Sequence, residues 1–228
     1  MRRLHTREAY LDLVELIRKK IPNVALSSDF IVGFCGETDE QFADTLSLIE
    51  LVKYDLAFLY QYSMRDKTHA YHNLKDNVSE EVKKKRLIEI IDVFKKNQLI
   101  RNKMDIGSYQ LVLVEGNGRL PGQLMGRADS YKSCIFENSL IYDRIPEFLE
   151  SKLKNIGNKA IDVNESMYNN YSVYNNDSNV TKSLINMKEY ILVKIHDVSY
   201  NSLFATPICK TSIREFNEVF KGNSLISS

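Results

Sequence analysis

The 228-residue sequence contains only three cysteines, Cys35, Cys134 and Cys209. They are odd in number and far apart, and none of them stands in a CxxC or CxxxC spacing. Their scarcity excludes a disulfide framework and a local cysteine-rich metal site. A reducing compartment is therefore the expected environment.

The sequence also lacks a charge excess of either sign and a long apolar run. Its 31 Lys and Arg residues oppose 30 Asp and Glu residues, so the formal net charge is +1. A nucleic-acid partner would therefore need a local positive patch, because no global basic field exists. No segment approaches the roughly 18 consecutive apolar residues of a membrane helix, and we expect no membrane partner.

Residues 6–104 predict alternating helices and strands. We expect helices at 6–20, from Thr38 onward and at 79–104, with strands at 24–34 and 56–62. The first helix is interpreted as a surface helix and not as a targeting presequence, because presequences are poor in acids. The order predicts a parallel sheet with helical crossovers. Two strands alone make a weak parallel sheet, so we expect the tail of a larger α/β repeat, prone to aggregate through its exposed edges.

The predicted secondary structure changes after Gly107, from alternating helices and strands to short strands. Short β-type segments separated by glycine turns predict a small barrel. They are interrupted by an Asn-, Ser- and Tyr-rich stretch at 164–183, which predicts a loop insertion with limits at about 143 and 186. The chain is thus predicted to combine an α/β region with a small β-barrel.

The stretch DFIVGFCGET, residues 29–38, places a glycine turn directly after a strand. In α/β sheets ligands bind at this carboxyl edge, and Gly33 and Gly36 permit a ligand to approach the backbone closely. Glu37 adds a hydrogen-bond acceptor. The alternative is a tight strand–helix loop with a capping box at Thr38 and Gln41, because a short glycine motif has low specificity.

Two regions offer side chains suited to RNA. The polar loop predicted at 63–71, after the second strand, carries Arg65 and Lys67, which could contact phosphates. The barrel segment QLMGRADSYK supplies amide, guanidinium, aromatic and amine groups at Gln123, Arg127, Tyr131 and Lys132. A solvated loop and an ordinary barrel surface remain the alternatives. The basic run KKKR at 83–86 lies among acids and is predicted to face solvent.

No catalytic or metal-binding residue is predicted. Cys35 stands beside Glu37, whose charge disfavours a thiolate, so we interpret this cysteine as a packing residue. The four histidines show no ligand spacing.

Several motifs nevertheless occur together in one order. They are MRRLHTREAYLDLVELIRKKIP, SSDFIVGFCGET, LYQYSMRDKTHAY, VSEEVKKKRL, LVLVEG and EYILVKI. Together they closely resemble the C-terminal half of MiaB-type tRNA methylthiotransferases, which are radical SAM enzymes. YSMRDKT resembles the animal mitochondrial branch, the cyclin-dependent-kinase regulatory-subunit-associated type, more than the bacterial YSPRPGT form. The resemblance covers almost all of the chain except the insertion and the extreme C-terminus.

The resemblance implies a domain order. Residues 1–75 would be the C-terminal part of a radical SAM partial (β/α) barrel, and 76–106 a linking helix. Residues 107–208 would be a TRAM domain, an OB-like RNA-binding β-barrel with the insertion at about 143–186, followed by a C-terminal tail at 209–228.

The resemblance also implies an activity. The family converts N6-isopentenyladenosine at tRNA position 37, in the anticodon stem-loop, to its 2-methylthio derivative. SAM serves as methyl donor and radical source, and two [4Fe–4S] clusters take part. The family's strand-end motif at the SAM site matches Val32, Gly33, Phe34, Gly36 and Glu37. Mitochondria are the location implied, with the cytoplasm as the alternative, although no targeting signal is visible in the sequence.

The sequence departs from the family at important positions. Cys35 and Met64 stand where the family usually has proline, and none of the three cysteines matches a cluster ligand. The CxxxCxxC motif of the family is expected upstream of Met1. Because a [4Fe–4S] cluster needs thiolate ligands, we expect the chain alone to be inactive. Two other readings stay open: a stand-alone RNA-binding module, and an interaction fragment for a kinase-regulatory protein, a partner implied by the family name only.

Overall fold

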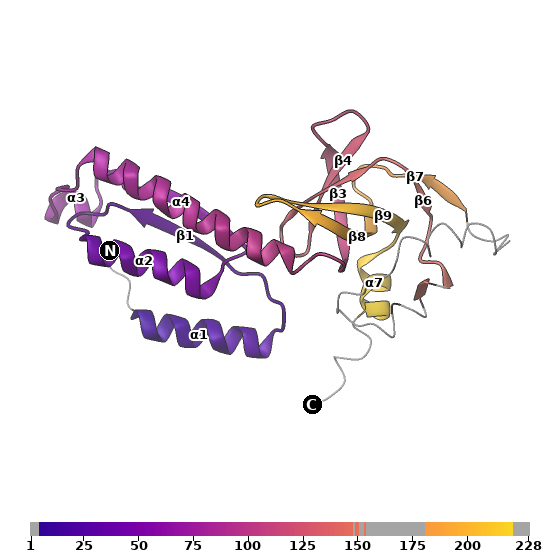
Figure 1. Ribbon diagram of the computed structural model, residues 1–228, viewed down its shortest axis with the longest axis horizontal. Helices are drawn as coiled ribbons and strands as arrows, with labels where there is room; N and C mark the ends of the chain where they lie inside the picture. Colours follow the sequence, from indigo (N-terminus) through magenta and orange to yellow (C-terminus); the bar gives the residue numbers. More distant parts are fainter. Residues whose placement is uncertain (1–4, 148, 151–152, 154–180, 221–228) are drawn as a thin grey trace. The chain divides into compact units, whose positions relative to one another are not determined.

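The computed structural model describes residues 5–147, 149–150, 153 and 181–220 (Figure 1). The chain divides into two compact units, residues 1–101 and 102–228. None of the described helices is both long enough and apolar enough to cross a membrane.

The first unit has the predicted alternation of helices and strands. Its elements are α1 (Arg7–Lys20), β1 (Ser27–Val32), α2 (Asp39–Val52), β2 (Leu56–Gln61), α3 (His69–Asn73) and α4 (Glu80–Lys103), whose last two residues belong to the second unit. Strands β1 and β2 pair in parallel, from Ser27 with Leu56 to Val32 with Gln61. The predicted parallel pairing is therefore confirmed, although β1 is shorter than the predicted strand at 24–34.

Local capping fixes where the helices begin. The Thr6 side chain accepts a hydrogen bond from the backbone N–H of Ala9 at the start of α1. At α2 the predicted capping box is present, because Thr38 Oγ1 accepts from the Gln41 N–H and Gln41 Oε1 accepts from the Thr38 N–H. These bonds satisfy donors that the first helical turn leaves free.

The core of this unit joins the two strands to three helices. Its buried members are Val14, Phe30, Val32, Phe42, Ile49, Val52, Tyr54, Ile90 and Phe94, from α1, β1, α2, the α2–β2 turn and α4. Burying these side chains drives the packing, at roughly 25 cal/mol for each Å² of apolar surface removed from water. Burial together with a hydrogen bond to Tyr10 raises the pKa of the Tyr54 phenol.

Two predictions for this unit are wrong. The polar loop predicted at 63–71 contains the start of α3, which Thr68 caps by accepting from the Tyr71 N–H. The run at 83–86 does not face solvent as a whole, because Lys83 is 1% exposed and Arg86 6% exposed. The reason lies in acidic partners, which are near in the sequence for Lys83 and distant for Arg86.

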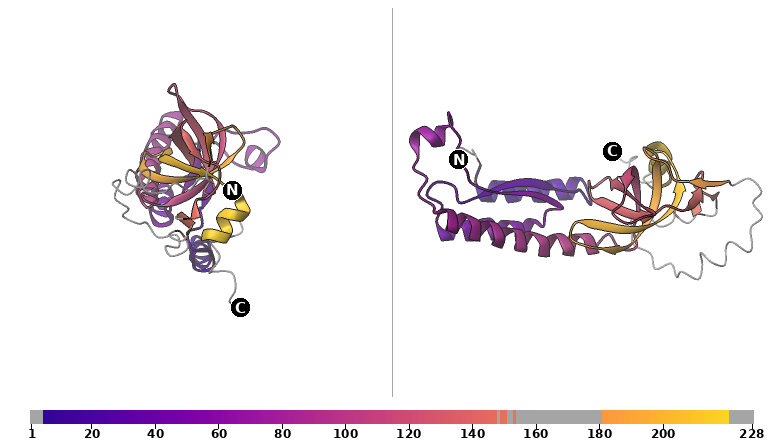
Figure 2. Two further views of the ribbon diagram at one scale, coloured as in Figure 1. Left: turned by 90° about the vertical axis from the view of Figure 1, so that its right-hand side faces the viewer. Right: turned by 90° about the horizontal axis from the view of Figure 1, so that it is seen from above.

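The second unit is built on a closed barrel. Its strands are β3 (Tyr109–Asn117), β4 (Gln123–Ala128), β5 (Ser133–Glu137), β6 (Leu140–Tyr142), β7 (Lys182–Leu184), β8 (Tyr190–Val198) and β9 (Ser202–Lys210). The order β5-β4-β3-β8-β9 closes because β5 also pairs with β9, in parallel. The left view of Figure 2 shows these strands curving around a common centre. The predicted combination of an α/β region with a β-barrel is confirmed.

Two apolar clusters hold this unit together. The barrel interior contains residues from every strand of the closed ring, among them Val112, Leu124, Cys134, Ile195 and Leu203. The second cluster lies outside the ring, where α7 (Ile213–Phe220) packs Phe216 and Phe220 with buried residues of β3, β8 and β9. Part of the predicted tail at 209–228 is thus the end of β9 and helix α7. The predicted insertion lies outside the described residues between 154 and 180, but its last part contains β7.

Two glycines of the β3–β4 ladder provide a test of barrel packing. A Cβ at Gly126 would lie 2.4 Å from the Leu113 carbonyl oxygen, whereas a Cβ at Gly116 would meet no atom within 4 Å. We expect Gly126→Ala to lower the free energy of unfolding by about 1–3 kcal/mol, the typical cost of overpacking. Gly116→Ala is the matched control. Urea titration of the full chain measures both, and equal stability of the two variants would contradict the close contact at Gly126.

Candidate functional site

The predicted ligand turn follows β1 directly. Gly33 has φ +73° and Gly36 has φ +74°, so both use the backbone region that favours glycine. The turn closes on itself, because the Glu37 N–H donates to the Phe34 carbonyl at 2.9 Å and the Gly33 N–H donates to Glu37 Oε2 at 2.6 Å. Asn77 Oδ1 accepts from the Gly36 N–H at 2.7 Å. The turn is therefore held by side chains as well as by its own backbone.

Arg86 of α4 ties this turn to the helix that follows much later in the chain. Its Nη1 donates to Glu37 Oε2 at 2.8 Å and to the Glu37 carbonyl at 3.1 Å, and its Nη2 donates to Asp39 Oδ1 at 2.7 Å. The Arg86 and Glu37 side chains are 7% and 11% exposed. Such a pair excludes water from both charges, so the loss of either partner leaves an uncompensated buried charge.

Lys83 lies beside Arg86 and is also buried. Its ammonium donates to Asp76 Oδ2 at 2.7 Å and to Glu80 Oε1 at 2.9 Å. Burial by itself lowers the pKa of Lys83, but the hydrogen bonds to the two carboxylates outweigh it, and the pKa of the ammonium group is raised. The lysine stem fills the space beside Gly33, where an added Cβ would lie 2.5 Å from Lys83 Cγ. Gly33 is thus required by packing as well as by its φ.

The aromatic side chains beside the turn are packed against each other. Phe34 meets Tyr62 edge-on, with ring centroids 4.9 Å apart, and the Lys83 ammonium lies 5.6 Å from the Tyr62 centroid. Burial and a hydrogen bond with Cys35 raise the pKa of the Tyr62 phenol. Cys35 is therefore part of this packed corner, as its interpretation as a packing residue expects.

The five residues predicted to bind SAM differ in how accessible they are to a ligand. The Val32 side chain is 1% exposed and belongs to the core, and Glu37 is engaged by Arg86 and by the Gly33 amide. Gly36, in contrast, is exposed and has open space where a side chain would project. A ligand approaching the turn would therefore meet Gly36 and the half-buried Phe34, while the other three hold the turn in shape.

Three of the four predicted RNA-binding residues of the barrel lie together. Arg127 and Tyr131 stand at the β4–β5 turn, with the guanidinium carbon 4.7 Å from the ring centroid, and Lys132 follows directly. The Arg127 Nε donates to Glu115 at 3.1 Å in a half-exposed pair, whereas Lys132 Nζ donates to Asp105 at 2.7 Å and its side chain is only 8% exposed. Gln123 begins β4, at the opposite end of that strand.

The other two predicted RNA-binding residues belong to the first unit. Arg65 and Lys67 are exposed in the turn before α3, where Lys67 has φ +62°. Their side chains have open access to solvent, which a phosphate contact requires.

The described residues contain no group of three or more His, Cys, Asp or Glu side chains that could hold a metal ion. Burial raises the pKa of the Cys134 and Cys209 thiols to about 12 each, as expected for cysteines that belong to apolar clusters.

Comparison with known proteins gives this geometry a context. No protein-family profile matches the chain. The human protein named mitochondrial tRNA methylthiotransferase CDK5RAP1 is 39% identical over 216 residues, which cover 94% of this chain and 31% of that protein. The tRNA-2-methylthio-N(6)-dimethylallyladenosine synthase of Prosthecochloris aestuarii is 46% identical over 140 residues, 60% of this chain and 31% of the enzyme. A rice CDK5RAP1-like protein is 52% identical over 131 residues, 57% of this chain and 22% of that protein.

The chain is homologous to one segment of the tRNA methylthiotransferases. That segment is the C-terminal portion of the relatives, and the resemblance predicted from the ordered motifs is confirmed. The chain spans less than a third of the length of the human relative, 31%.

Two residues that hold the turn after β1 in place were missed by sequence reasoning. Lys83 and Arg86 were read as part of a solvated basic run, although Lys83, Arg86, Ile90 and Phe94 recur at helical spacing on one buried face of α4. That spacing is the signal that could have found them. A basic residue on the apolar stripe of a helix indicates a buried acidic partner, because an unpaired charge is rarely buried.

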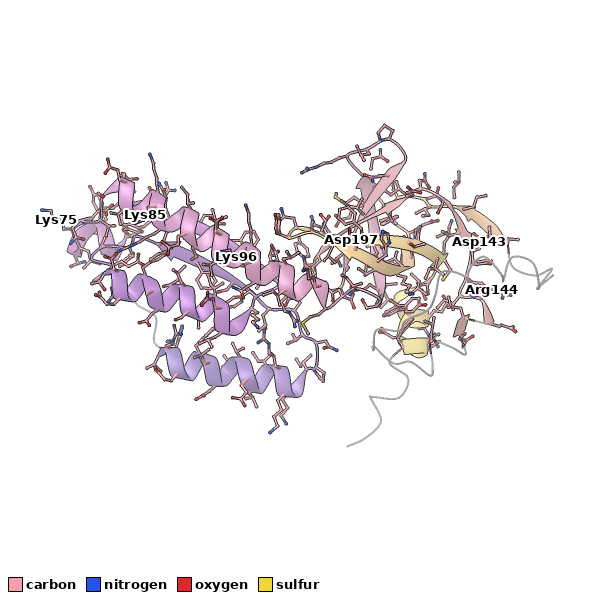
Figure 3. The ribbon with its side chains drawn as sticks, in the orientation of Figure 1. Lys75, Lys85, Lys96, Asp143, Arg144 and Asp197 are labelled. Atoms are coloured by element: carbon pink, nitrogen blue, oxygen red, sulfur yellow. The ribbon has the colours of Figure 1, made fainter. Side chains whose placement is uncertain are left out.

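The ion pair of Arg86 can be tested against its exposed neighbour. We expect Arg86→Met to lower the free energy of unfolding by about 3 kcal/mol or more, because Glu37 then keeps a buried charge without its cation. Lys85→Met, at the exposed neighbouring lysine of α4 (Figure 3), should change it by less than about 0.5 kcal/mol. Urea titration measures both. If the double variant Arg86→Met with Glu37→Gln is no more stable than Arg86→Met alone, the assigned pairing is wrong.

Proposed function

We propose that this chain is part of a mitochondrial tRNA methylthiotransferase that converts N6-isopentenyladenosine at position 37 of tRNA to its 2-methylthio derivative. The observation that carries the proposal is the 39% identity to the human mitochondrial tRNA methylthiotransferase over 216 residues. The match to a bacterial 2-methylthio-N(6)-dimethylallyladenosine synthase supports the same chemistry.

The first unit would contribute to binding SAM. We assign this unit as part of a radical SAM partial barrel, a proposal that its parallel pair of strands with helical crossovers supports. The open space at Gly36 and the half-buried Phe34 ring suit the close approach of such a cofactor, and Arg86 and Lys83 would keep the turn in place. When bound, SAM supplies the methyl group and the radical. Gly36 and Phe34 of this chain would contact it at the turn.

Cluster binding is not assigned to any described residue. A [4Fe–4S] cluster needs thiolate ligands, and Cys134 and Cys209 are buried in separate apolar clusters of the second unit. Cys35 lies alone at the turn of the first unit.

The second unit would bind the tRNA anticodon stem-loop. We interpret its five-stranded ring as a TRAM-like domain, because the barrel type and the glycine turns agree with it. Arg127 can exchange its half-exposed partner Glu115 for a phosphate at little cost, since exposed ion pairs contribute only about 0–1 kcal/mol. Lys132 is less free to do so, because its buried ammonium already binds Asp105.

A segment exchange tests the enzymatic assignment. We expect a human enzyme whose matching 216-residue segment is replaced by this chain to restore 2-methylthio-N6-isopentenyladenosine in cells that lack the enzyme. Mass spectrometry of digested tRNA measures the product, and the human enzyme without the segment is the negative control. A soluble exchange protein that binds tRNA and SAM but yields no product would contradict the proposal.

RNA binding by the full chain can be tested through its salt dependence. Arg127→Ala should weaken binding of an anticodon stem-loop and reduce the slope of log K against log salt by about 1, as expected when one phosphate contact is lost. Arg144→Ala removes the same charge from an exposed position of the same unit (Figure 3) and should leave the slope unchanged. Fluorescence anisotropy at several salt concentrations measures it, and equal slopes for all three proteins would refute an Arg127–phosphate contact.

A further inference from the structure

Two exposed tyrosines, Tyr131 and Tyr200, lie at one rim of the barrel although they are 69 positions apart in the sequence. Strands β5 and β9 run in parallel, with Ser133 paired to Ser202. Tyr131 and Tyr200 each precede this pair by two positions, so the register of the strands brings them to the same end of the barrel. Tyr131 is 63% exposed and Tyr200 47% exposed.

The turn that carries Tyr131 is rigid. The Ala128 N–H donates to the Lys132 carbonyl at 3.0 Å, and the Tyr131 N–H donates to the Ala128 carbonyl at 2.8 Å. Tyr131 itself has φ +62°, and its ring lies under the Arg127 guanidinium. The cation orders the ring and leaves the tyrosine largely exposed to solvent.

The turn that carries Tyr200 is held equally well. The Ser199 N–H donates to the Ser202 carbonyl at 2.8 Å, and the Ser202 N–H donates to Ser199 Oγ at 3.1 Å. The Asn102 side-chain amide donates to the carbonyls of Ser199 and Tyr200, at 2.8 and 2.9 Å. Both tyrosines therefore project from fixed backbone, which lowers the entropic cost of binding a partner.

Two buried polar atoms at these two turns have no hydrogen-bond partner within the part of the chain that the structure describes. They are Ser130 Oγ and Asn102 Oδ1, and neither atom forms a hydrogen bond with another described residue. Ser130 directly precedes Tyr131, and the Asn102 amide donates to the carbonyls of the turn that carries Tyr200, so each of these buried residues is adjacent to a turn that carries one of the two rings.

The rim carries little net charge among its paired groups. Arg127 faces Glu115, and Lys132 faces Asp105. Asp129 is also exposed in the first turn, so the rim is not a concentrated phosphate-binding patch. Exposed aromatic rings beside paired charges suit a planar polar ligand more than an anion. Unpaired nucleobases have this character, because they stack on aromatic rings and offer hydrogen-bonding edges.

We propose that Tyr131 and Tyr200 form a stacking platform for unpaired bases of RNA. The proposal rests on the proposed tRNA-binding function and deepens it by separating two kinds of contact. The tyrosines bind bases through contacts that depend little on salt, while Arg127 carries the ionic contact. Tyr200 is added to the residues that the sequence alone predicts for RNA binding.

The experiment uses the full chain and an anticodon stem-loop with 2-aminopurine at single loop positions. We expect Tyr200→Ala to weaken binding at least about 5-fold, the loss of one base–aromatic contact, with an unchanged salt slope. Tyr200→Phe should bind as the unmodified chain does, because the ring remains. At one loop position, the 2-aminopurine fluorescence change on binding should be kept with Tyr200→Phe and lost with Tyr200→Ala. Leu140→Ala, at an exposed residue of β6 that is also 63% exposed, is the matched surface control.

The outcomes separate the platform from the broader function. If Tyr200→Ala and Tyr131→Ala both bind the stem-loop as tightly as the unmodified chain does, the platform is overturned and tRNA binding stands. If Tyr200→Ala weakens binding only by lowering the salt slope, the tyrosine acts through Arg127 and the stacking assignment is overturned. Failure of the unmodified chain to bind any stem-loop would overturn both the platform and the RNA-binding role of the barrel. Urea titration of each alanine variant distinguishes lost contact from lost fold.

Discussion

The buried ion pair between Arg86 and Glu37 is the contact on which the first unit's candidate site depends. It joins a turn at the end of β1 to a helix 49 residues further along the chain. Glu37 at the same time binds the Gly33 amide, so one carboxylate fixes both the start of the turn and its distance from α4. A buried pair of this kind contributes little net stability compared with apolar packing, but it makes the geometry specific, because any other arrangement leaves a charge unpaired.

Lys83 also holds this turn in place, through packing of its side chain against Gly33. Its ammonium is neutralised by Asp76 and Glu80, so the aliphatic stem can be buried against Gly33. A long side chain with a paired head serves here as a packing residue. The consequence is a turn whose Gly33 and Glu37 are held in place while Gly36 stays exposed.

Local signals in the sequence were enough to predict the elements but not their faces. The capping box at Thr38, the apolar strand before Gly33 and the glycine turns of the barrel all act within a few residues, and each appears where it was predicted. The burial of Arg86 depends on acids 47 and 49 residues earlier, and that of Lys83 on acids 7 and 3 residues earlier. Composition alone therefore placed Lys83 and Arg86 in solvent. A helical-spacing analysis that admitted basic residues to the apolar stripe would have corrected this.

The barrel rim shows the same limit in another form. Arg127, Tyr131 and Lys132 could be grouped from sequence because they are neighbours, whereas Tyr200 joins them only through the parallel pairing that closes the barrel. Lys132 was also grouped with them from the sequence, but its ammonium group is buried and binds Asp105. Because the strand register decides which turns share a rim, the residues that gather at this rim are a property of barrel closure and cannot be obtained from any single segment.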